Sequence, residues 1–339
     1  MVSTSDLKFG IIGCGLIGTK RAMCLPKGSL SICIDTKQST ARDMLHKSDH
    51  LGAHIARDLT SENVDMADVW FVCTPHKYLY EYSRTLIVAG KHVMIEKPGA
   101  ISSVELEDME KIAKAKRELT VRVGYNHRFH DAFLCILKGI NTNFIGNIMS
   151  INAYYGHGGA WINKKDDWRL EKRLNGGGDF IDKGSHLVDL IQWILIDDLS
   201  VEFSSLKTRF SDASVEDNSI VVMKGIRKGA DVVVQTSCTD WKNTFRFEIH
   251  GKKGKILIQG LGGSYGTEKV TLYGMKEGKI KPEISSLKWL EDNSFQKETD
   301  EFIQDIGFGF GDSIAGRSDL SNAQKTMKII EEVYQRNNQ

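Results

Sequence analysis

The chain has 339 residues, with 45 lysines and arginines against 44 aspartates and glutamates, and its formal net charge is +1. This balance argues against a protein that binds nucleic acid through bulk positive charge. No apolar run approaches the ~18 residues of a membrane span, and the first apolar run resembles a strand rather than a secretory signal. The six cysteines lack C-x-x-C pairing, which indicates buried thiols in a reducing compartment. We therefore expect a soluble cytoplasmic α/β protein with no nucleic-acid or membrane partner.

The first 125 residues alternate short apolar runs with longer amphipathic ones. The predicted strands are 8–12, 31–34, 69–73, 92–96 and 120–125, and the predicted helices between them include 77–89 and 103–117. Uninterrupted apolar strands separated by helices are typical of a parallel sheet that helices cover on both faces. Residues 1–125 are thus predicted to form a doubly wound Rossmann-type domain.

The remaining residues, 126–339, are predicted to form a second α/β domain. A helix over 180–195 is followed by strand-like runs at 201–210, 218–225, 231–239, 244–250, 254–259 and 268–273, and residues 146–156 alternate in the same way. Such alternation indicates an antiparallel sheet with one solvated face. With only four prolines in the chain, no stiff linker is expected, and the final helix, about 319–336, could pack back on the first domain.

A glycine-rich loop follows the first strand in the segment "GIIGCGLIGTK". The chemistry of dinucleotide binding needs glycine at three points: the tight turn (Gly13), the pyrophosphate approach (Gly15) and close helix packing (Gly18). Asp35 ends the second strand, where a carboxylate accepts ribose hydroxyls and repels a 2′-phosphate, so NAD is favoured over NADP. Lys37 and Arg42 weaken that preference. The predicted cofactor contacts in this region are Gly13, Cys14, Gly15, Leu16, Ile17, Gly18, Asp35 and Thr36. The alternative is an ordinary glycine turn beside a surface aspartate.

A second predicted site follows the fourth strand, in "VMIEKPGAI". Glu96, Lys97 and Pro98 lie at the carboxyl end of a parallel strand, where open α/β sheets bind ligands. A Lys97–Pro98 bond in the cis form would direct the lysine into the cleft. The alternative is a solvated lysine in a turn. Thr74, Pro75 and His76, after the third strand of this series, are expected to line the same cofactor site.

The segment "GGGDFIDKGSHLVDL" places Asp182, His186 and Asp189 at spacings of four and three, on one face of a helix. This pattern fits a metal site, an acid/base site or a solvated helix face. A metal is disfavoured because no second His/Cys cluster supplies further ligands. Histidine is a suitable base for alcohol oxidation, and a nearby ammonium would stabilise the alkoxide. We therefore interpret Lys97, Asp182 and His186 as catalytic and Asp189 as supporting, with Gly176–Gly178 as a flexible lead-in to the helix.

Together, "GIIGCGLIG", "EKP" (96–98), "GYNHRF" (124–129) and "GGGDFIDKGSHLVDL" (176–190) resemble the Gfo/Idh/MocA oxidoreductases over essentially the whole chain. The resemblance implies a Rossmann domain and an α/β domain whose open, mostly antiparallel sheet forms a dimer or tetramer interface. It also implies that Lys97, Asp182 and His186 form the catalytic group. One departure is that the family often has a histidine about four residues after Thr74-Pro75, where this chain has Leu79 and Tyr80.

Substrate contacts are expected from the segment 156–173 and from the strand after "EKP". Aromatic rings suit a sugar and excess cations suit a phosphate, although a charge-balanced surface loop is an equal alternative. The predicted substrate-binding residues are Lys97, Asn126, Arg128, Tyr155, His157, Trp161, Trp168, Arg169, Asp182 and His186. The sequence thus predicts an NAD-dependent dehydrogenase of a sugar or nucleotide-sugar, working without a metal as a homodimer or homotetramer. A non-catalytic NAD(P) sensor or scaffold and an NAD-dependent glycosidase are the alternatives.

Overall fold

The computed structural model describes residues 6–141, 144–159, 167–210, 213–274, 283–308 and 318–337. The chain divides into two compact units: residues 1–126 with 295–324, and residues 127–294 with 325–339. The predicted second domain, 126–339, differs from the second unit mainly by the segment 295–324, which belongs to the first. The final helix, α9 (Leu320–Asn337), has its first five residues in the first unit and the remainder in the second.

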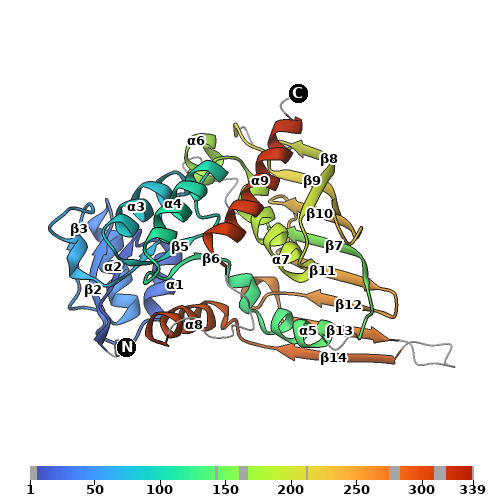
Figure 1. Cartoon of the computed structure of the whole chain (residues 1–339), viewed down its shortest axis with the longest axis horizontal. Coiled ribbons are helices and arrows are strands. Elements are labelled where there is room, and N and C mark those ends of the chain that lie inside the picture. Colours follow the sequence, from blue (N-terminus) through green and yellow to red (C-terminus); the bar gives the residue numbers. More distant parts are fainter. Residues whose placement is uncertain are drawn as a thin grey trace. The chain divides into compact units, whose positions relative to one another are not determined.

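The first unit contains the predicted parallel sheet, in which β2, β3, β5 and β6 can be located in Figure 1. Its six strands lie in the order β3-β2-β1-β4-β5-β6. The strands are β1 (Phe9–Ile12), β2 (Leu30–Ile34), β3 (His54–Ala56), β4 (Val69–Val72), β5 (His92–Glu96) and β6 (Val121–Gly124). The helices that alternate with them are α1 (Leu16–Met23), α2 (Gln38–Ser48), α3 (His76–Val88) and α4 (Ser103–Ala115). This strand order is that of a Rossmann fold, which confirms the predicted fold class. The prediction missed β3, because it has only three residues and none is fully buried.

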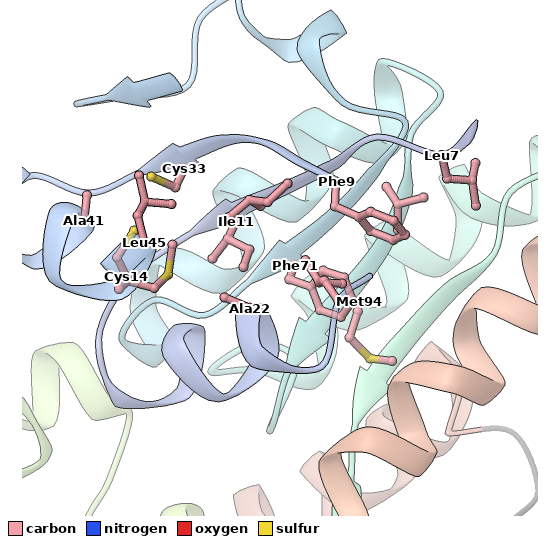
Figure 2. Packing of buried hydrophobic residues seen from close by; sticks show 14 of the residues in the cluster. Leu7, Phe9, Ile11, Cys14, Ala22, Cys33, Ala41, Leu45, Phe71 and Met94 are labelled. Carbon is pink, nitrogen blue, oxygen red and sulfur yellow. The ribbon is translucent and has the colours of Figure 1, made fainter. Parts of the chain in front are cut away.

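The core of this unit lies against the central strands. Every residue of β1 and β4 is buried, which explains their uninterrupted apolar sequences. Figure 2 shows the side chains of Phe9, Phe71 and Met94 meeting in this core. Helix α8 (Ser294–Phe308) adds Phe302, whose ring lies 5.9 Å from that of Phe71 in an edge-to-face contact. Burying this apolar surface holds the segment 295–308 in the first unit.

A buried charge cluster reinforces that attachment. Arg21 on α1 is fully buried, and its Nη2 lies 2.7 Å from a carboxylate oxygen of Glu96 and 2.6 Å from one of Glu298 on α8. Although burial by itself lowers the pKa of the guanidinium, the two carboxylates outweigh it and raise that pKa above its usual value. A Cβ at Gly124 would lie 2.6 Å from Arg21 Nη2, so the end of β6 needs glycine here.

The second unit contains an eight-stranded sheet in the order β14-β13-β12-β11-β7-β10-β9-β8. Its strands are β7 (Ile148–Gly156), β8 (Leu199–Lys207), β9 (Asn218–Gly225), β10 (Asp231–Ser237), β11 (Thr244–Gly251), β12 (Gly254–Gln259), β13 (Glu268–Gly274) and β14 (Glu283–Trp289). Only the β7–β10 pair is parallel, which confirms the predicted, mostly antiparallel sheet. Helices α5 (Asp131–Asn141) and α7 (Ser185–Leu195) pack on it, and the short helix α6 (Lys172–Asn175) precedes α7.

Side-chain alternation along β9 shows how the sheet is solvated. Ser219, Val221 and Met223 are buried, whereas Ile220 between them is exposed. This period of two is the pattern that the sequence showed. In the described ranges, no helix has both the length and the apolar character that crossing a membrane requires.

Candidate active site

The glycine loop between β1 and α1 has the geometry of a dinucleotide cradle. Gly13 has φ +90°, and a Cβ there would lie 2.6 Å from the carbonyl oxygen of Cys73. A Cβ at Gly18 would lie 2.0 Å from the Gly13 oxygen, so only glycine lets α1 start this close to the strand. Gly15, by contrast, faces open space, because a Cβ there would have no described neighbour within 4 Å. Two glycines therefore serve packing and one leaves room for a ligand at the start of α1.

Asp35 lies beside this loop at the end of β2. Its Oδ2 accepts the Cys14 N–H at 2.9 Å and its Oδ1 accepts the Lys37 N–H at 2.8 Å. Each carboxylate oxygen can accept a further hydrogen bond, so the group can still receive two hydroxyls of a ribose. The Arg42 guanidinium, which the sequence placed near a possible 2′-phosphate, contacts Gln38 Oε1 at 3.3 Å.

The other predicted cofactor residues follow neighbouring parallel strands and therefore share one edge of the sheet. Thr74 and Pro75 follow β4, and the buried His76 begins α3. The Thr74 hydroxyl is buried and has no hydrogen-bond partner among the described residues. Lys97 and Pro98 follow β5, and the bond between them is cis. Together with an open Gly15 and a fixed acceptor at the end of β2, this edge fits a bound dinucleotide.

Some of the predicted cofactor residues have other surroundings. Leu16 is 72% exposed at the start of α1, whereas Ile17 is half-buried. Thr36 is exposed beside Asp35. Glu96 is committed to the buried Arg21, so its carboxylate has a structural part in this unit. Asn126, predicted to contact substrate, is buried just after β6.

In the second unit, the glycine-rich segment leads into a π turn, η5 (Phe180–Gly184), which continues as α7. π turns inside helices often mark functional sites. A Cβ at Gly177 would lie 2.2 Å from the Tyr334 hydroxyl, and one at Gly178 would lie 2.0 Å from the backbone carbonyl oxygen of Glu216. These two glycines therefore allow close packing at the start of the turn. Gly184 likewise makes room for the Phe180 ring, 2.5 Å from a Cβ position.

Glu216 anchors the start of this turn. Its Oε1 accepts the Phe180 N–H at 2.9 Å and the Tyr334 hydroxyl at 2.7 Å, and its Oε2 accepts the Gly178 N–H at 3.0 Å. Burial raises the pKa of Glu216 to about 7, and these donors limit the rise. The sequence offered no signal for this residue, because its partners come from distant parts of the chain.

Asp182 lies within the π turn, close to two other predicted substrate residues. Arg169, on the short 3₁₀ helix η4 (Trp168–Leu170), approaches it with Nε 3.8 Å from Oδ2. The same guanidinium lies over the Trp168 ring, 4.7 Å from its centroid, and pairs with Asp167 at 3.2 Å. The structure therefore brings Asp182, Trp168 and Arg169 together. Trp161, also predicted to bind substrate, lies outside the described residues, as do the neighbouring residues 160–166.

A buried ion pair between Asp179 and Lys183 lies one turn before His186. Burial lowers the pKa of the ammonium, but the carboxylates of Asp179 and Asp182 outweigh it and hold that pKa above its usual value. His157 lies within electrostatic range of this group. Burial lowers the pKa of His157, and the positive charge of Lys183 lowers it further. At neutral pH, this side of the unit thus combines the Lys183 ammonium, the neutral His157 imidazole and the carboxylates of Asp179 and Asp182.

His186 lies on α7, is 6% exposed, and stacks on a second imidazole. The ring centroids of His186 and His127 are 3.8 Å apart with an interplanar angle of 16°. His127 Nε2 lies 3.2 Å from the Tyr155 hydroxyl oxygen, and the Tyr155 ring meets Tyr265 edge-on at 5.3 Å. Burial raises the pKa of Tyr155 well above its usual value and that of Tyr265 to about 12. Both phenols therefore remain protonated at neutral pH.

Arg128 and Asp189 form a buried ion pair. Arg128 Nε and Nη2 donate to the two Asp189 oxygens at 2.7 and 2.5 Å, and both side chains are almost fully buried. The guanidinium also lies 5.6 Å from the Trp193 ring centroid. Arg128 was predicted to contact substrate; two of its N–H groups donate to Asp189 in this interior pair. The supporting part expected of Asp189 agrees with this contact. Because His186 and Asp189 are both buried, a solvated helix face is excluded.

Sequence reasoning missed His127, which stacks on His186, and Tyr265, which contacts Tyr155. His127 was quoted within "YNHRF" but given no role, and Tyr265 follows a glycine-rich turn that carries no motif. Only the stacking of His127 on His186 and the edge contact of Tyr265 with Tyr155 identify them. Within the described ranges, no group of three or more histidine, cysteine or acidic side chains has the arrangement of a metal site.

Comparison with known proteins identifies relatives along most of the chain. Residues 7–127 match the model of the oxidoreductase family with an NAD-binding Rossmann fold, and residues 135–257 match the GFO/IDH/MocA C-terminal domain. The scyllo-inositol 2-dehydrogenase (NADP(+)) IolW of Bacillus subtilis is 27% identical over 76% of this chain and 70% of its own length. The glucose-6-phosphate 3-dehydrogenase of the same organism is 29% identical over 63% of this chain and 61% of its own.

Solved structures of similar fold cover nearly the whole chain. A levoglucosan dehydrogenase in complex with NADH and levoglucosan has a TM-score of 0.82 at 19% identity, over 97% of this chain and 96% of its own. KijD10, a 3-ketoreductase from Actinomadura kijaniata in complex with NADP and TDP-benzene, has a TM-score of 0.80 at 16% identity, over 97% of both chains. At such identities the likeness concerns the fold alone. The two matching family models, the strand order and the glycine cradle establish that this chain belongs to the Gfo/Idh/MocA family of oxidoreductases.

Proposed function

We propose that this protein is an NAD(H)-dependent dehydrogenase that interconverts a secondary alcohol and a ketone on a sugar or nucleotide-sugar. The observation that carries the proposal is His186, a buried histidine on a helix whose preceding π turn presents Asp182 beside an arginine. It occurs in a chain whose Rossmann unit has a complete glycine cradle. The relatives named above act, by their names, on inositol and on a sugar phosphate, which supports a polyhydroxylated substrate.

The cofactor preference rests on Asp35. Its carboxylate is held by two backbone N–H groups at the end of β2, where it would accept the ribose hydroxyls and repel a 2′-phosphate. We therefore assign NAD(H) rather than NADP(H), although IolW is named as an NADP(+) enzyme. The residues assigned to the cofactor are the loop Gly13–Gly18, Asp35, Thr36 and the residues that follow β4 and β5.

The chemistry assigned to the chain's own residues is proton transfer and charge stabilisation. A bound nicotinamide ring would supply the hydride acceptor or donor. His186 takes the hydroxyl proton of the substrate during oxidation and returns it during reduction. Lys97, as an ammonium, stabilises the negative charge that develops on the substrate oxygen. Asp182 orients the imidazole or binds a neighbouring hydroxyl of the substrate.

The remainder of the substrate is assigned to the residues around Asp182. Trp168 offers a ring face for a sugar. Arg169 would donate hydrogen bonds from its N–H groups to a hydroxyl or phosphate oxygen of the substrate. Tyr155 and His157 supply polar groups from β7 and the segment after it. Trp161 retains its predicted part as a substrate contact.

A substrate panel tests the proposed function. The protein is incubated with polyols, sugars, sugar phosphates and nucleotide-sugars, each with NAD and NADP, and the formation of reduced cofactor is followed at 340 nm. Lys97→Met and His186→Gln are measured beside wild type, with Lys47→Ala and His46→Ala, both exposed on α2, as matched controls. We expect kcat/KM of the first two variants to fall by ~10²–10⁴-fold and that of the controls to stay unchanged.

The outcomes separate the candidate functions. If Lys97→Met and His186→Gln turn over like wild type on the best substrate, the assigned catalytic roles are wrong. If the protein binds NADH but oxidises or reduces nothing in the panel, a sensor or scaffold is the better assignment. If a glycoside is cleaved without net reduced cofactor, the protein is an NAD-dependent glycosidase.

We also propose a homodimer or homotetramer that forms through the eight-stranded sheet. Phe203 on β8 and Ile220 on β9, adjacent antiparallel strands, are 55% and 44% exposed. Exposed apolar side chains on adjacent strands of an open sheet face suit self-association. Light scattering after size exclusion should give a multiple of the 38.0 kDa chain mass, reduced by Ile220→Glu but not by Val104→Glu, whose site on α4 is 72% exposed. A monomeric wild type would refute the proposal.

A further inference from the structure

The stack of His127 on His186 is an unusual arrangement for two titratable rings. Both imidazoles are 6% exposed, and their planes are nearly parallel at a centroid separation of 3.8 Å. His127 comes from the 3₁₀ turn η3 (Asn126–Phe129), whereas His186 comes from α7, so the contact joins two separate elements. Nothing in the proposed mechanism requires His127, and the sequence motif that contains it gave it no role.

Several neighbours hold the His127 ring in its plane. The Tyr155 hydroxyl lies 3.2 Å from His127 Nε2, and the Phe245 ring meets the imidazole edge-on at 6.1 Å. His130 meets it edge-on at 5.3 Å and is itself bound to Glu268 through Nδ1 at 2.8 Å. A ring held by a hydrogen bond and by aromatic edges on several sides can act as a rigid support for the ring stacked on it.

The titratable groups around the stack come from several elements. Tyr155 lies on β7, and Glu268 on β13 acts through His130. Asp179, Asp182 and the Lys183 ammonium precede His186, and the two carboxylates raise the pKa of Tyr155. Tyr265, before β13, completes the set. Because Tyr155 remains protonated at neutral pH, its contact with His127 places no negative charge against the imidazole ring.

Two imidazoles at this distance resist being positively charged at the same time. Coulomb's law at an effective dielectric constant of about 20 gives a penalty of roughly a thousandfold in the binding of a second proton when the first ring is already charged. Neutral His127, in contrast, offers the polarisable face of an aromatic ring to an imidazolium. A stack of this kind therefore favours the uptake of one additional proton by the two neutral rings and disfavours the uptake of a second.

We propose that His127 is the positioning residue of His186: its ring fixes the plane of the His186 imidazole, and the two histidines together bind one proton in the working pH range. The inference rests on the proposed function, in which His186 exchanges a proton with the substrate. His127 does not touch the reacting atoms in this scheme. It acts by keeping His186 oriented and by staying neutral when His186 takes the proton.

Two substitutions separate ring support from simple packing. His127→Phe keeps a flat ring in the stack, whereas His127→Leu fills similar space without one. With the best substrate from the panel, we expect His127→Leu to lower kcat ~100-fold with KM changed less than ~3-fold, and His127→Phe to recover at least ~10-fold of that loss. Tyr155→Phe, which removes the hydrogen bond and keeps the ring, should fall between them. Equal kcat in the Phe and Leu variants, or wild-type kcat in both, would overturn the proposal.

Proton counting tests the pair without any substrate. Histidine ring resonances of the intact protein are recorded by NMR from pH 8 to 5, and the two rings are assigned by comparison with His127→Phe and His186→Phe. One proton taken up by the pair over this range supports the proposal, and two overturn it. This readout remains valid if His127→Leu fails to fold. It also separates the two proposals: wild-type turnover in His186→Gln refutes the proposed function, whereas two protons on the pair refute only the inference about His127.

Discussion

The buried carboxyl group of Glu216 makes the stability of this protein depend on pH. Glu216 accepts two backbone N–H groups of the turn before α7 and the hydroxyl of Tyr334. Burial raises its pKa from an ordinary value near 4.5 to about 7, with the hydrogen bonds opposing the rise. The folded protein therefore binds the Glu216 proton more tightly than the unfolded chain does.

The size and sign of the effect follow from this difference. A pKa of about 7 against 4.5 corresponds to about 3 kcal/mol of linked free energy. Since the folded-state pKa is the higher one, the contribution is fully present below pH 4.5 and is lost as the pH rises through about 7. The glutamate thus lowers the free energy of unfolding by about 3 kcal/mol between acidic and mildly alkaline conditions.

Urea unfolding at a series of pH values from 5 to 8 measures this dependence. Other groups titrate over the same range, so the quantity of interest is the difference in unfolding free energy between wild type and Glu216→Gln. We expect that difference to shift by about 3 kcal/mol across the range, in favour of the glutamine variant at high pH. Glu202→Gln, at an exposed position on β8, should show no shift. A difference that stays constant for Glu216→Gln would refute the reasoning.

Three further predictions concern the cofactor cradle and the interior of the second unit. Asp35→Ser should raise the kcat/KM ratio of NADP to NAD by about tenfold or more, because a 2′-phosphate would no longer face a carboxylate. Gly15→Ala should weaken NADH binding by at least ~10-fold in a fluorescence titration without lowering the melting temperature. Gly18→Ala should lower both the NADH affinity and the melting temperature, because its Cβ would lie 2.0 Å from a backbone oxygen. Asp189→Asn should reduce the free energy of unfolding by about 3–5 kcal/mol in urea, because it leaves the buried Arg128 charge without its partner.

Each of these has an outcome that would contradict it. An unchanged NADP to NAD ratio in Asp35→Ser would remove the basis for the proposed cofactor preference. Equal melting temperatures for the two alanine variants would mean that the start of α1 can move away from the strand. For Asp189, the exposed pair of Asp198 and Lys325 is a matched control, and Asp198→Asn should cost less than about 1 kcal/mol. A similar cost for both variants would contradict the role of burial.

Much of the fold followed from local patterns. In the first sheet, β1 and β4 are buried along their whole length because both faces are covered, whereas β9 in the second sheet alternates because one face is solvated. The exceptions were short or mostly exposed elements, such as β3 and β14, which carry little of either signal. Helix α8 was missed for a different reason: its amphipathic surface gives no indication of which unit it packs against, and Phe302 and Glu298 decide that.

The sequence by itself determined the fold class, the family resemblance and the cofactor cradle, because three glycines and an aspartate act through the backbone of adjacent elements. Only the tertiary structure decided what the polar side chains near α7 do. It paired Arg128 with Asp189, attached Glu216 to the turn at Gly178, and stacked His127 on His186. These partners lie far apart in the chain, and burial gives each contact its strength. A sequence pattern records residue types and spacing, but burial and long-range partners appear only once the chain has folded.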